Sequence, residues 1–166
     1  MNIFIYDLDH ETNAKYHPDK QLIKMILEMA QILSTNYRHL TTYEGSDVYK
    51  TTHLNHPNTI WARETYDNFN FVVDLYYALH NEWNSRYAHD KIHKSFEIVD
   101  FIIENTSSNN FKKVGRTEFM QTMPEKYRCK NAVDAYRKYF NGDKLHLAQW
   151  KGASKPDWVD TQKLCI

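Results

Sequence analysis

Residues 22–33 read Leu-Ile-Lys-Met-Ile-Leu-Glu-Met-Ala-Gln-Ile-Leu, and this stretch decides the fold class. Its apolar residues recur at the i, i+4, i+7 and i+11 positions that share one face of an α-helix: Leu22, Ile26, Met29 and Leu33. Pro18 suits the first helical position, because an N–H there would be unpaired in any case. The pattern predicts an amphipathic helix from about His17 to about Thr35.

The rest of the chain alternates helical segments with polar loops. The apolar spacing predicts further helices over about 57–87 with a break near Thr65, 91–104, 118–122, and 131–142, with one or two turns more in 143–150. Loops are expected over 39–56 and 105–116, and a brief turn capped by Asp9 is expected through Asn13. Residues 2–7 are expected to be buried, either as a short strand or as an extended segment. The prediction is therefore an all-α single domain over residues 1–166, with room for one short N-terminal strand.

Composition limits the class of protein. Only 4 Gly and 4 Pro in 166 residues favour helices, and 14% aromatic residues supply both a core and rings for a binding site. Cys129 and Cys165 have no metal or redox spacing, which favours a reducing compartment over a disulfide between them. No signal peptide and no apolar run of membrane-spanning length is evident, so we expect a cytoplasmic protein without a membrane partner. The 21 basic and 21 acidic residues balance, which disfavours a duplex-DNA partner because such proteins usually carry a basic excess.

A polar stripe accompanies the apolar face of the first long helix. It consists of Lys20, Lys24, Glu28 and Gln31, with His17 at its start. Glu28 is a candidate general base, and the lysines are candidates for phosphate contacts. The alternative is a solvated face carrying a Lys24–Glu28 pair.

A second polar group precedes and enters the next helix. His53, Asn55 and His56 lie just before Pro57, and Trp61 and Arg63 follow. A helix N-terminus attracts anions, an amide pairs with base edges, and an indole stacks on a base. The alternative is ordinary capping, with Asn55 accepting the free N–H groups of the helix.

His89 and His93 are four residues apart, so on a helix they would share one face and could bind a metal. The adjacent His89-Asp90 pair is also similar to that of helical HD-type phosphohydrolases. The further ligands would have to come from positions such as His56 and Asp134, whose spacing is loose. We therefore predict no metal site and no cofactor.

The C-terminal third interleaves aromatic and basic residues. Tyr136, Arg137 and Lys144 are candidates for stacking on a base and binding its phosphates. The alternative is that the tyrosine packs in the core while the charges stay outside.

Several segments resemble a group of small bacteriophage proteins. The similarity covers most of the chain and lies in 16–20, 24–31, 52–57, 123–127 and 135–139. It carries little information about activity.

Residues 16 to about 90 also resemble the helical pyrimidine-dimer DNA glycosylases. The matching positions are Glu28, as the catalytic glutamate, Asn55-His56-Pro57, and Arg86-Tyr87. The resemblance implies a free N-terminal amine that forms a Schiff base with the sugar and then cleaves the backbone. Two features depart from the family: the bulk of Asn2 disfavours removal of Met1, and the chain is neutral where DNA-binding members are basic.

Three hypotheses follow, in order of preference. The first is a phage-type nucleotide-binding protein, as a monomer or a homodimer, that sequesters a cyclic or ADP-ribose-type immune signal as an anti-defence function. In it, Arg86 and the polar residues named above surround the ligand. The second is a DNA glycosylase/lyase that uses Glu28 and an amine, either the N-terminus or a lysine. The third is an interaction protein without a ligand, marked by an exposed apolar patch.

Overall fold

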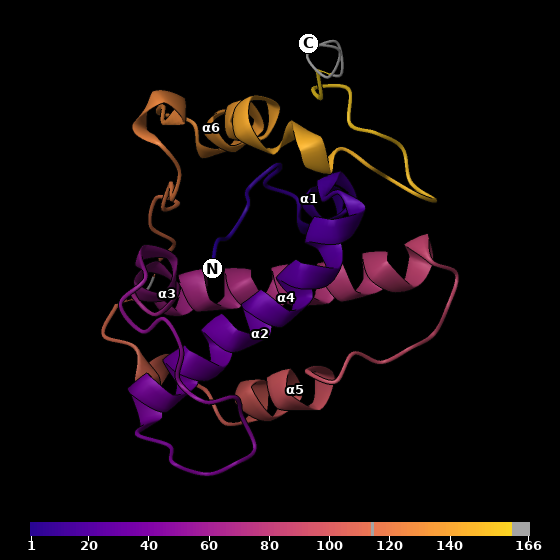
Figure 1. Cartoon of the computed structure of the whole chain (residues 1–166). Helices are drawn as coiled ribbons and strands as arrows, with labels where there is room; N and C mark the ends of the chain where they lie inside the picture. Colours follow the sequence, from indigo (N-terminus) through magenta and orange to yellow (C-terminus); the bar gives the residue numbers. More distant parts are fainter. Residues whose placement is uncertain (114, 161–166) are drawn as a thin grey trace.

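Two long helices, α2 (Asp19–Thr41) and α4 (Tyr66–Arg86), pack against each other at the centre of the computed structural model (Figure 1). The structure describes residues 1–113 and 115–160. Each helix buries one apolar stripe, and the α2 stripe contains the four residues that the sequence pattern predicts: Leu22, Ile26, Met29 and Leu33. The prediction of an all-α fold is therefore confirmed for the described residues, which contain no strand.

The helix α2 begins where Pro18 predicts but continues to Thr41, beyond the expected end near Thr35. Ser34 and Asn36 look like the end of a helix in the sequence, yet both are fully buried. The Ser34 hydroxyl donates to the carbonyl of Ala30, and the Asn36 amide donates to the carbonyl of Thr59 at 3.0 Å. A bond within the helix satisfies Ser34 and a tertiary partner satisfies Asn36, so neither side chain ends the helix.

The segments next to α2 begin where the sequence predicts, but the first runs on to Tyr16, beyond the expected end at Asn13. Asp9 accepts a hydrogen bond from the backbone N–H of Thr12, and the expected brief turn is a seven-residue helix, α1 (His10–Tyr16). The expected break near Thr65 separates α3 (Pro57–Ala62) from α4. The Thr65 hydroxyl caps α4 by accepting from the backbone N–H of Asn68 at 3.0 Å.

The N-terminal strand does not form in the described part of the chain. Residues 3–6 are extended and buried, and the Asn13 side chain takes the place of a strand partner. It accepts from the backbone N–H of Tyr6 at 2.9 Å and donates to the carbonyl of Phe4 at 3.1 Å. One amide side chain on α1 therefore satisfies the backbone that a second strand would pair.

Three further expectations were wrong in their bounds or type. The helix α5 (Phe96–Glu104) begins at Phe96, because residues 91–95 are held by side-chain contacts outside a helix. The expected helix over 118–122 is absent; there the Gln121 amide pairs with the backbone of Cys129. Asn131 caps α6 (Ala132–Tyr139) as predicted, but the chain passes Gly142 in a π-helical turn, η3 (Phe140–Lys144).

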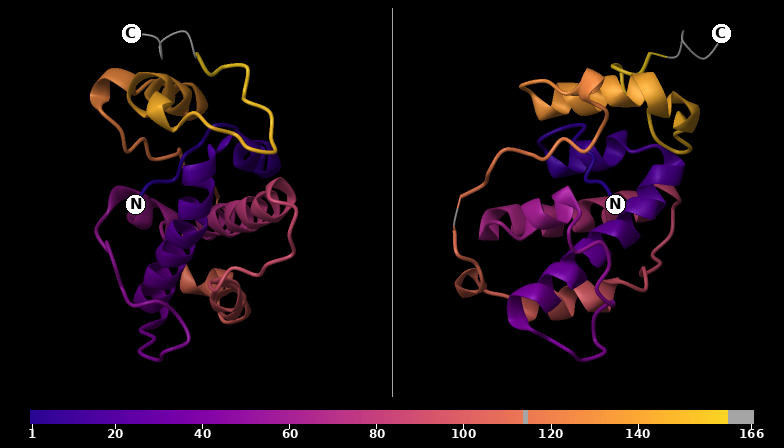
Figure 2. Two further views of the ribbon diagram at one scale, coloured as in Figure 1. Left: turned by 45° about the vertical axis from the view of Figure 1, so that its right-hand side comes forward. Right: turned by 60° about the vertical axis from the view of Figure 1, so that its left-hand side comes forward.

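The last part of the chain covers the N-terminal segment. Figure 2 shows α6 and the segment after it as a layer beside α1 and the extended N-terminus, with α5 on the far side of α4. Short 3-10 turns complete this part of the fold: η1 (Ser108–Asn110), η2 (Glu125–Tyr127) and η4 (Leu145–Leu147). Trp158 anchors the layer, since its ring lies 5.3 Å from Tyr6 and 5.7 Å from Phe140. No helix among residues 1–113 and 115–160 is long and apolar enough to cross a membrane.

Candidate active site around Glu28

Glu28 lies in the middle of α2, at the point where the start of the chain meets the polar stripe. Its side chain is only 13% exposed, and its Oε1 lies 3.2 Å from Nζ of Lys24. Its Oε2 accepts a hydrogen bond from the backbone nitrogen of Asn2 at 3.2 Å. A largely buried carboxylate therefore faces the first peptide of the chain and one lysine.

The side chain of Asn2 holds this end of the chain in place. Its Oδ1 accepts from Nδ2 of Asn58 at 2.8 Å and from the Thr122 hydroxyl, and it lies 3.0 Å from the hydroxyl of Tyr136. Its Nδ2 donates to the carbonyl of Thr122 at 3.1 Å. Four separate parts of the chain thus meet at Asn2, and this network fixes the distance between Asn2 and Glu28.

His56 is the residue before α3 and lies within electrostatic reach of the Glu28 carboxylate. Its Nδ1 accepts from the backbone N–H of Asn58 at 3.2 Å, so the cap of α3 is His56 rather than Asn55. Burial lowers the pKa of His56, the amino group at the start of the chain and His53 lower it further, and the Glu28 carboxylate opposes them. A neutral imidazole is therefore favoured within electrostatic reach of Glu28 and an amino group.

The structure brings some of the predicted ligand residues to this site and places others elsewhere. Lys24, Glu28, His53 and His56 cluster with the start of the chain. Lys20 and Gln31 lie on the same helix, exposed and half-buried respectively. Asn55 is exposed beside His56, without a recorded side-chain bond among the described residues.

Four predicted ligand residues are buried within the fold. Trp61 is 3% exposed, and Tyr136 belongs to the Asn2 network. His17 is fully buried, and burial lowers its pKa to about 4. Arg86 donates to the carbonyl of His17 at 2.8 Å and forms ion pairs with Asp19 and Glu82.

Two C-terminal candidates lie against aromatic rings. Arg137 donates to the carbonyl of Tyr6 at 2.8 Å, pairs with Asp7 at 3.1 Å and packs over the ring of Trp158. Lys144 lies 5.4 Å from the ring centre of Tyr139. Both cations are half-buried, whereas the alternative expected the charges to stay outside.

His89 and His93 do not share a helix face, because both lie between the end of α4 and the start of α5. The ring of His93 contacts the Ser95 hydroxyl, and that of His89 packs on Trp83 at 4.4 Å. Within residues 1–113 and 115–160, no group of three or more His, Cys, Asp or Glu side chains is placed to hold a metal ion.

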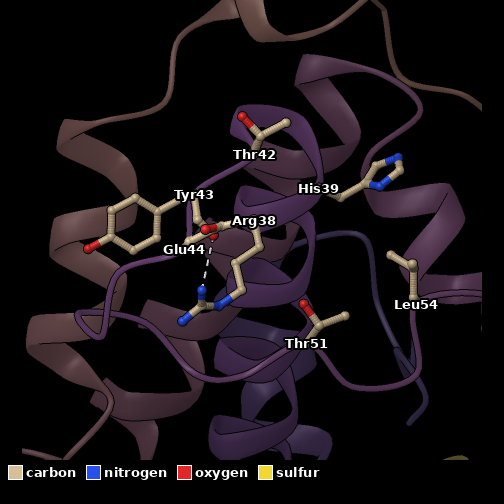
Figure 3. A pocket seen from close by; sticks show the side chains of 7 residues that line it. All are labelled: Arg38, His39, Thr42, Tyr43, Glu44, Thr51 and Leu54. Carbon is tan, nitrogen blue, oxygen red and sulfur yellow. Dashed lines mark hydrogen bonds between the residues drawn. The ribbon is translucent and has the colours of Figure 1, made fainter.

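A hollow of about 440 Å³ opens at the C-terminal end of α2 (Figure 3). Its cation is Arg38, whose guanidinium donates to four backbone carbonyls: those of Tyr43, Gly45, Val48 and Tyr49. Arg38 therefore closes the loop after α2, and its donors are used by the chain itself.

Sequence reasoning missed Asn2, Asn58 and Thr122. Asn58 was detectable in principle, as a polar residue on the buried side of a short helix. Thr122 left no signal, since its partner lies 120 positions away in the chain.

The fold and the site together define a helical protein in which a carboxylate on the central helix faces the start of the chain. The chain belongs to the pyrimidine dimer DNA glycosylase family, whose model matches residues 1–95, more than half of the 166 residues. The match includes Asn2, Glu28 and His56 and ends before Thr122 and Tyr136. No curated protein matched the chain. No solved structure matched it.

Proposed function

We propose that this protein is a DNA glycosylase with lyase activity whose reacting centre is Glu28 and the amino group at the start of the chain. One observation carries the proposal: the largely buried Glu28 carboxylate accepts a hydrogen bond at 3.2 Å from the backbone nitrogen of Asn2, next to the amino group at the start of the chain. The family match over residues 1–95 supports the same reaction class.

The chemistry requires an amine and a carboxylate close together. The amine attacks C1′ of the damaged nucleotide, forming a C–N bond as the bond between C1′ and the base breaks, and the base leaves with a proton. Loss of the amine proton and opening of the sugar ring give a Schiff base. Removal of a proton from C2′ then breaks the bond from C3′ to its phosphate. In this proposal Glu28 relays these protons.

Two amino groups are candidates for the nucleophile. One is Nζ of Lys24, 3.2 Å from Glu28; the other is the amino group at the start of the chain, which precedes the Asn2 nitrogen bonded to Glu28, and we favour this second group. A lysine becomes a good nucleophile when it is desolvated or lies beside another cation. Lys24 meets neither condition, because its side chain is 69% exposed and paired with a carboxylate. We assign Lys24 to a phosphate of the substrate instead.

Borohydride trapping tests the proposal directly. The protein is incubated with an oligonucleotide carrying a cyclobutane pyrimidine dimer, reduced, and digested for peptide mass spectrometry. We expect a covalent adduct on the first peptide at Met1 or Asn2, lost in Glu28→Gln and retained in Lys24→Gln. Glu97→Gln, on the exposed side of α5, is the matched control. An adduct on Lys24, or none at all, would overturn the assignment.

The nucleotide-binding hypothesis has less support from this geometry. It needs His17, Arg86 and either Trp61 or Tyr136 around one ligand, yet these side chains are buried. Sequestration of an immune nucleotide by a phage protein stays a prediction. Native mass spectrometry with cyclic and ADP-ribose-type nucleotides tests it, and retention of unchanged ligand at fixed stoichiometry would favour it over catalysis.

A further inference from the structure

A second hollow, of about 520 Å³, lies between the end of α2, the exposed side of α3 and the segment before residue 114. Three cations line it: Arg63, Lys112 and Lys113. Leu40 and Ile60 add apolar surface, and Ile60 is 45% exposed. Lys112 and Lys113 lie outside the region that matches the glycosylase family.

Arg63 is a partly desolvated cation with unused donors. Its Nη1 donates to the carbonyl of Leu54 at 2.8 Å and to Oδ1 of Asn36 at 3.3 Å, both of which are neutral acceptors. Within the described residues, its Nε and Nη2 have no hydrogen-bond acceptor and the guanidinium has no carboxylate partner. Burial lowers the pKa of Arg63, because it removes water from the charged guanidinium. A bound anion would stabilise that charge.

The acidic residue at this hollow does not cancel its positive charge. Glu64 lies 3.8 Å from Lys113, and its other oxygen accepts from the Thr117 hydroxyl at 3.2 Å. Three cations against one carboxylate leave two positive charges, while the whole chain is neutral. The local excess is the kind that phosphate groups neutralise.

The hollow is aligned with the Glu28 site. His39 lines its edge and follows Glu28 by eleven positions on α2, which brings the two within about 20° around the helix axis and about 16 Å along it. Ile60 follows His56 by four positions on α3, so these two also share a helix face. One strand of B-form DNA carries a phosphate about every 3.4 Å, so the separation of about 16 Å between Glu28 and His39 along α2 equals about five nucleotides.

We propose that this hollow binds phosphodiester groups of a DNA strand, about five nucleotides from the damaged nucleotide at Glu28. Arg63, Lys112 and Lys113 contact the phosphates, and Ile60 packs against a deoxyribose. The assignment of the strand rests on the proposed glycosylase function.

Fluorescence anisotropy with duplexes of two lengths tests the proposal. Each duplex carries one pyrimidine dimer, flanked on both sides by either three or ten base pairs. We expect Lys112→Ala/Lys113→Ala to weaken binding of the long duplex about tenfold and to lower the salt slope by about two, with no change on the short duplex. Lys91→Ala/Lys94→Ala removes the same charge from exposed lysines away from the hollow, and should change neither the affinity for the long duplex nor the salt slope.

Borohydride trapping on the short duplex tests the glycosylase reaction separately from phosphate binding in the hollow. Equal losses from both lysine pairs, or equal losses on both duplexes, would overturn the phosphate site even if trapping succeeds. A length-dependent loss without any trapped adduct would overturn the reaction and leave the hollow as a DNA-binding site.

Discussion

At the residue scale, one amide organises the candidate active site. Asn2 joins α3, the segment before residue 124 and α6 through Asn58, Thr122 and Tyr136. Asn2 follows the residue that carries the amino group proposed as the nucleophile. The side chain of Asn2 is hydrogen-bonded within the fold, and its backbone nitrogen donates to Glu28.

Removing one hydroxyl from this network should weaken both the fold and the site. Tyr136 is fully buried, and its hydroxyl lies 2.8 Å from the Met120 carbonyl and 3.0 Å from Asn2. Tyr136→Phe leaves these acceptors short of a donor, so we expect a loss of about 1–3 kcal/mol in the free energy of unfolding. Urea denaturation measures it, and borohydride trapping should slow in parallel. Tyr66→Phe, whose hydroxyl has no recorded bond in the described residues, should be close to neutral.

His17 makes the stability depend on pH. Burial lowers its pKa to about 4 in the folded protein, whereas an unfolded histidine titrates near 6.5. Between about pH 4 and pH 6.5 the unfolded state binds a proton at His17 that the folded state does not. The contribution of neutral His17 to the free energy of unfolding is therefore complete above about pH 6.5 and declines as the pH falls towards 4. The free energy of unfolding lost across this whole pH range is about 3 kcal/mol. Urea unfolding at pH 7 and pH 5 should show a smaller difference for His17→Gln than for the parent protein; an unchanged difference would contradict the assignment.

At the element scale, the helix ends follow local rules except where tertiary contacts extend or replace them. Asp9, Thr65 and Asn131 each accept backbone N–H groups at the start of a helix. The end of α2 differs, because the buried amide of Asn36 bonds to the Thr59 carbonyl and the helix continues to Thr41. Arg38 can therefore reach the carbonyls of the following loop and close it.

The Thr65 cap gives a clean test at this scale. Its hydroxyl accepts from Asn68 at the start of the 21-residue helix that carries much of the core. Thr65→Ala should lower the free energy of unfolding by about 1 kcal/mol, whereas Thr65→Ser keeps the oxygen and should retain most of it. Chemical denaturation of the pair measures the difference. Equal losses in both variants would assign the effect to the methyl group.

At the scale of the whole molecule, Arg86 connects three parts of the fold. From the end of α4 it pairs with Asp19, and it donates to the carbonyls of His17 and Lys15. Asp19 in turn accepts the backbone N–H of Lys151, which ties in the C-terminal segment. Gly152 follows at φ +70°, and a Cβ there would lie 2.5 Å from the Arg86 carbonyl, so the close approach requires glycine.

Removing Arg86 should destabilise the whole chain. Its side chain is fully buried, and Arg86→Met leaves the carboxylates of Asp19 and Glu82 without their partner. We expect a loss of about 3–5 kcal/mol in the free energy of unfolding, because an uncompensated buried charge is costly. Thermal and urea unfolding measure it. Lys138→Met removes an exposed cation and serves as the control; a loss no larger than that control would rule out a structural role for Arg86.

The sequence alone predicts the features that depend on neighbouring residues. The buried stripe of α2, the break at Thr65, the cap at Asn131 and the candidacy of Glu28 all follow from periodicity, capping and residue type. Such signals span a few positions, so they can be read without coordinates. The family match over residues 1–95 agrees with this part of the fold.

Only the tertiary structure decides which distant residues meet. Asn2 and Tyr136 are 134 positions apart, and no local pattern predicts their contact. The same holds for Arg86, whose buried partners convert a predicted ligand residue into a structural one, and for the cations of Arg63 and Lys112, which share one hollow. These outcomes depend on which helix faces pack together, and packing is set by the whole core rather than by any single segment.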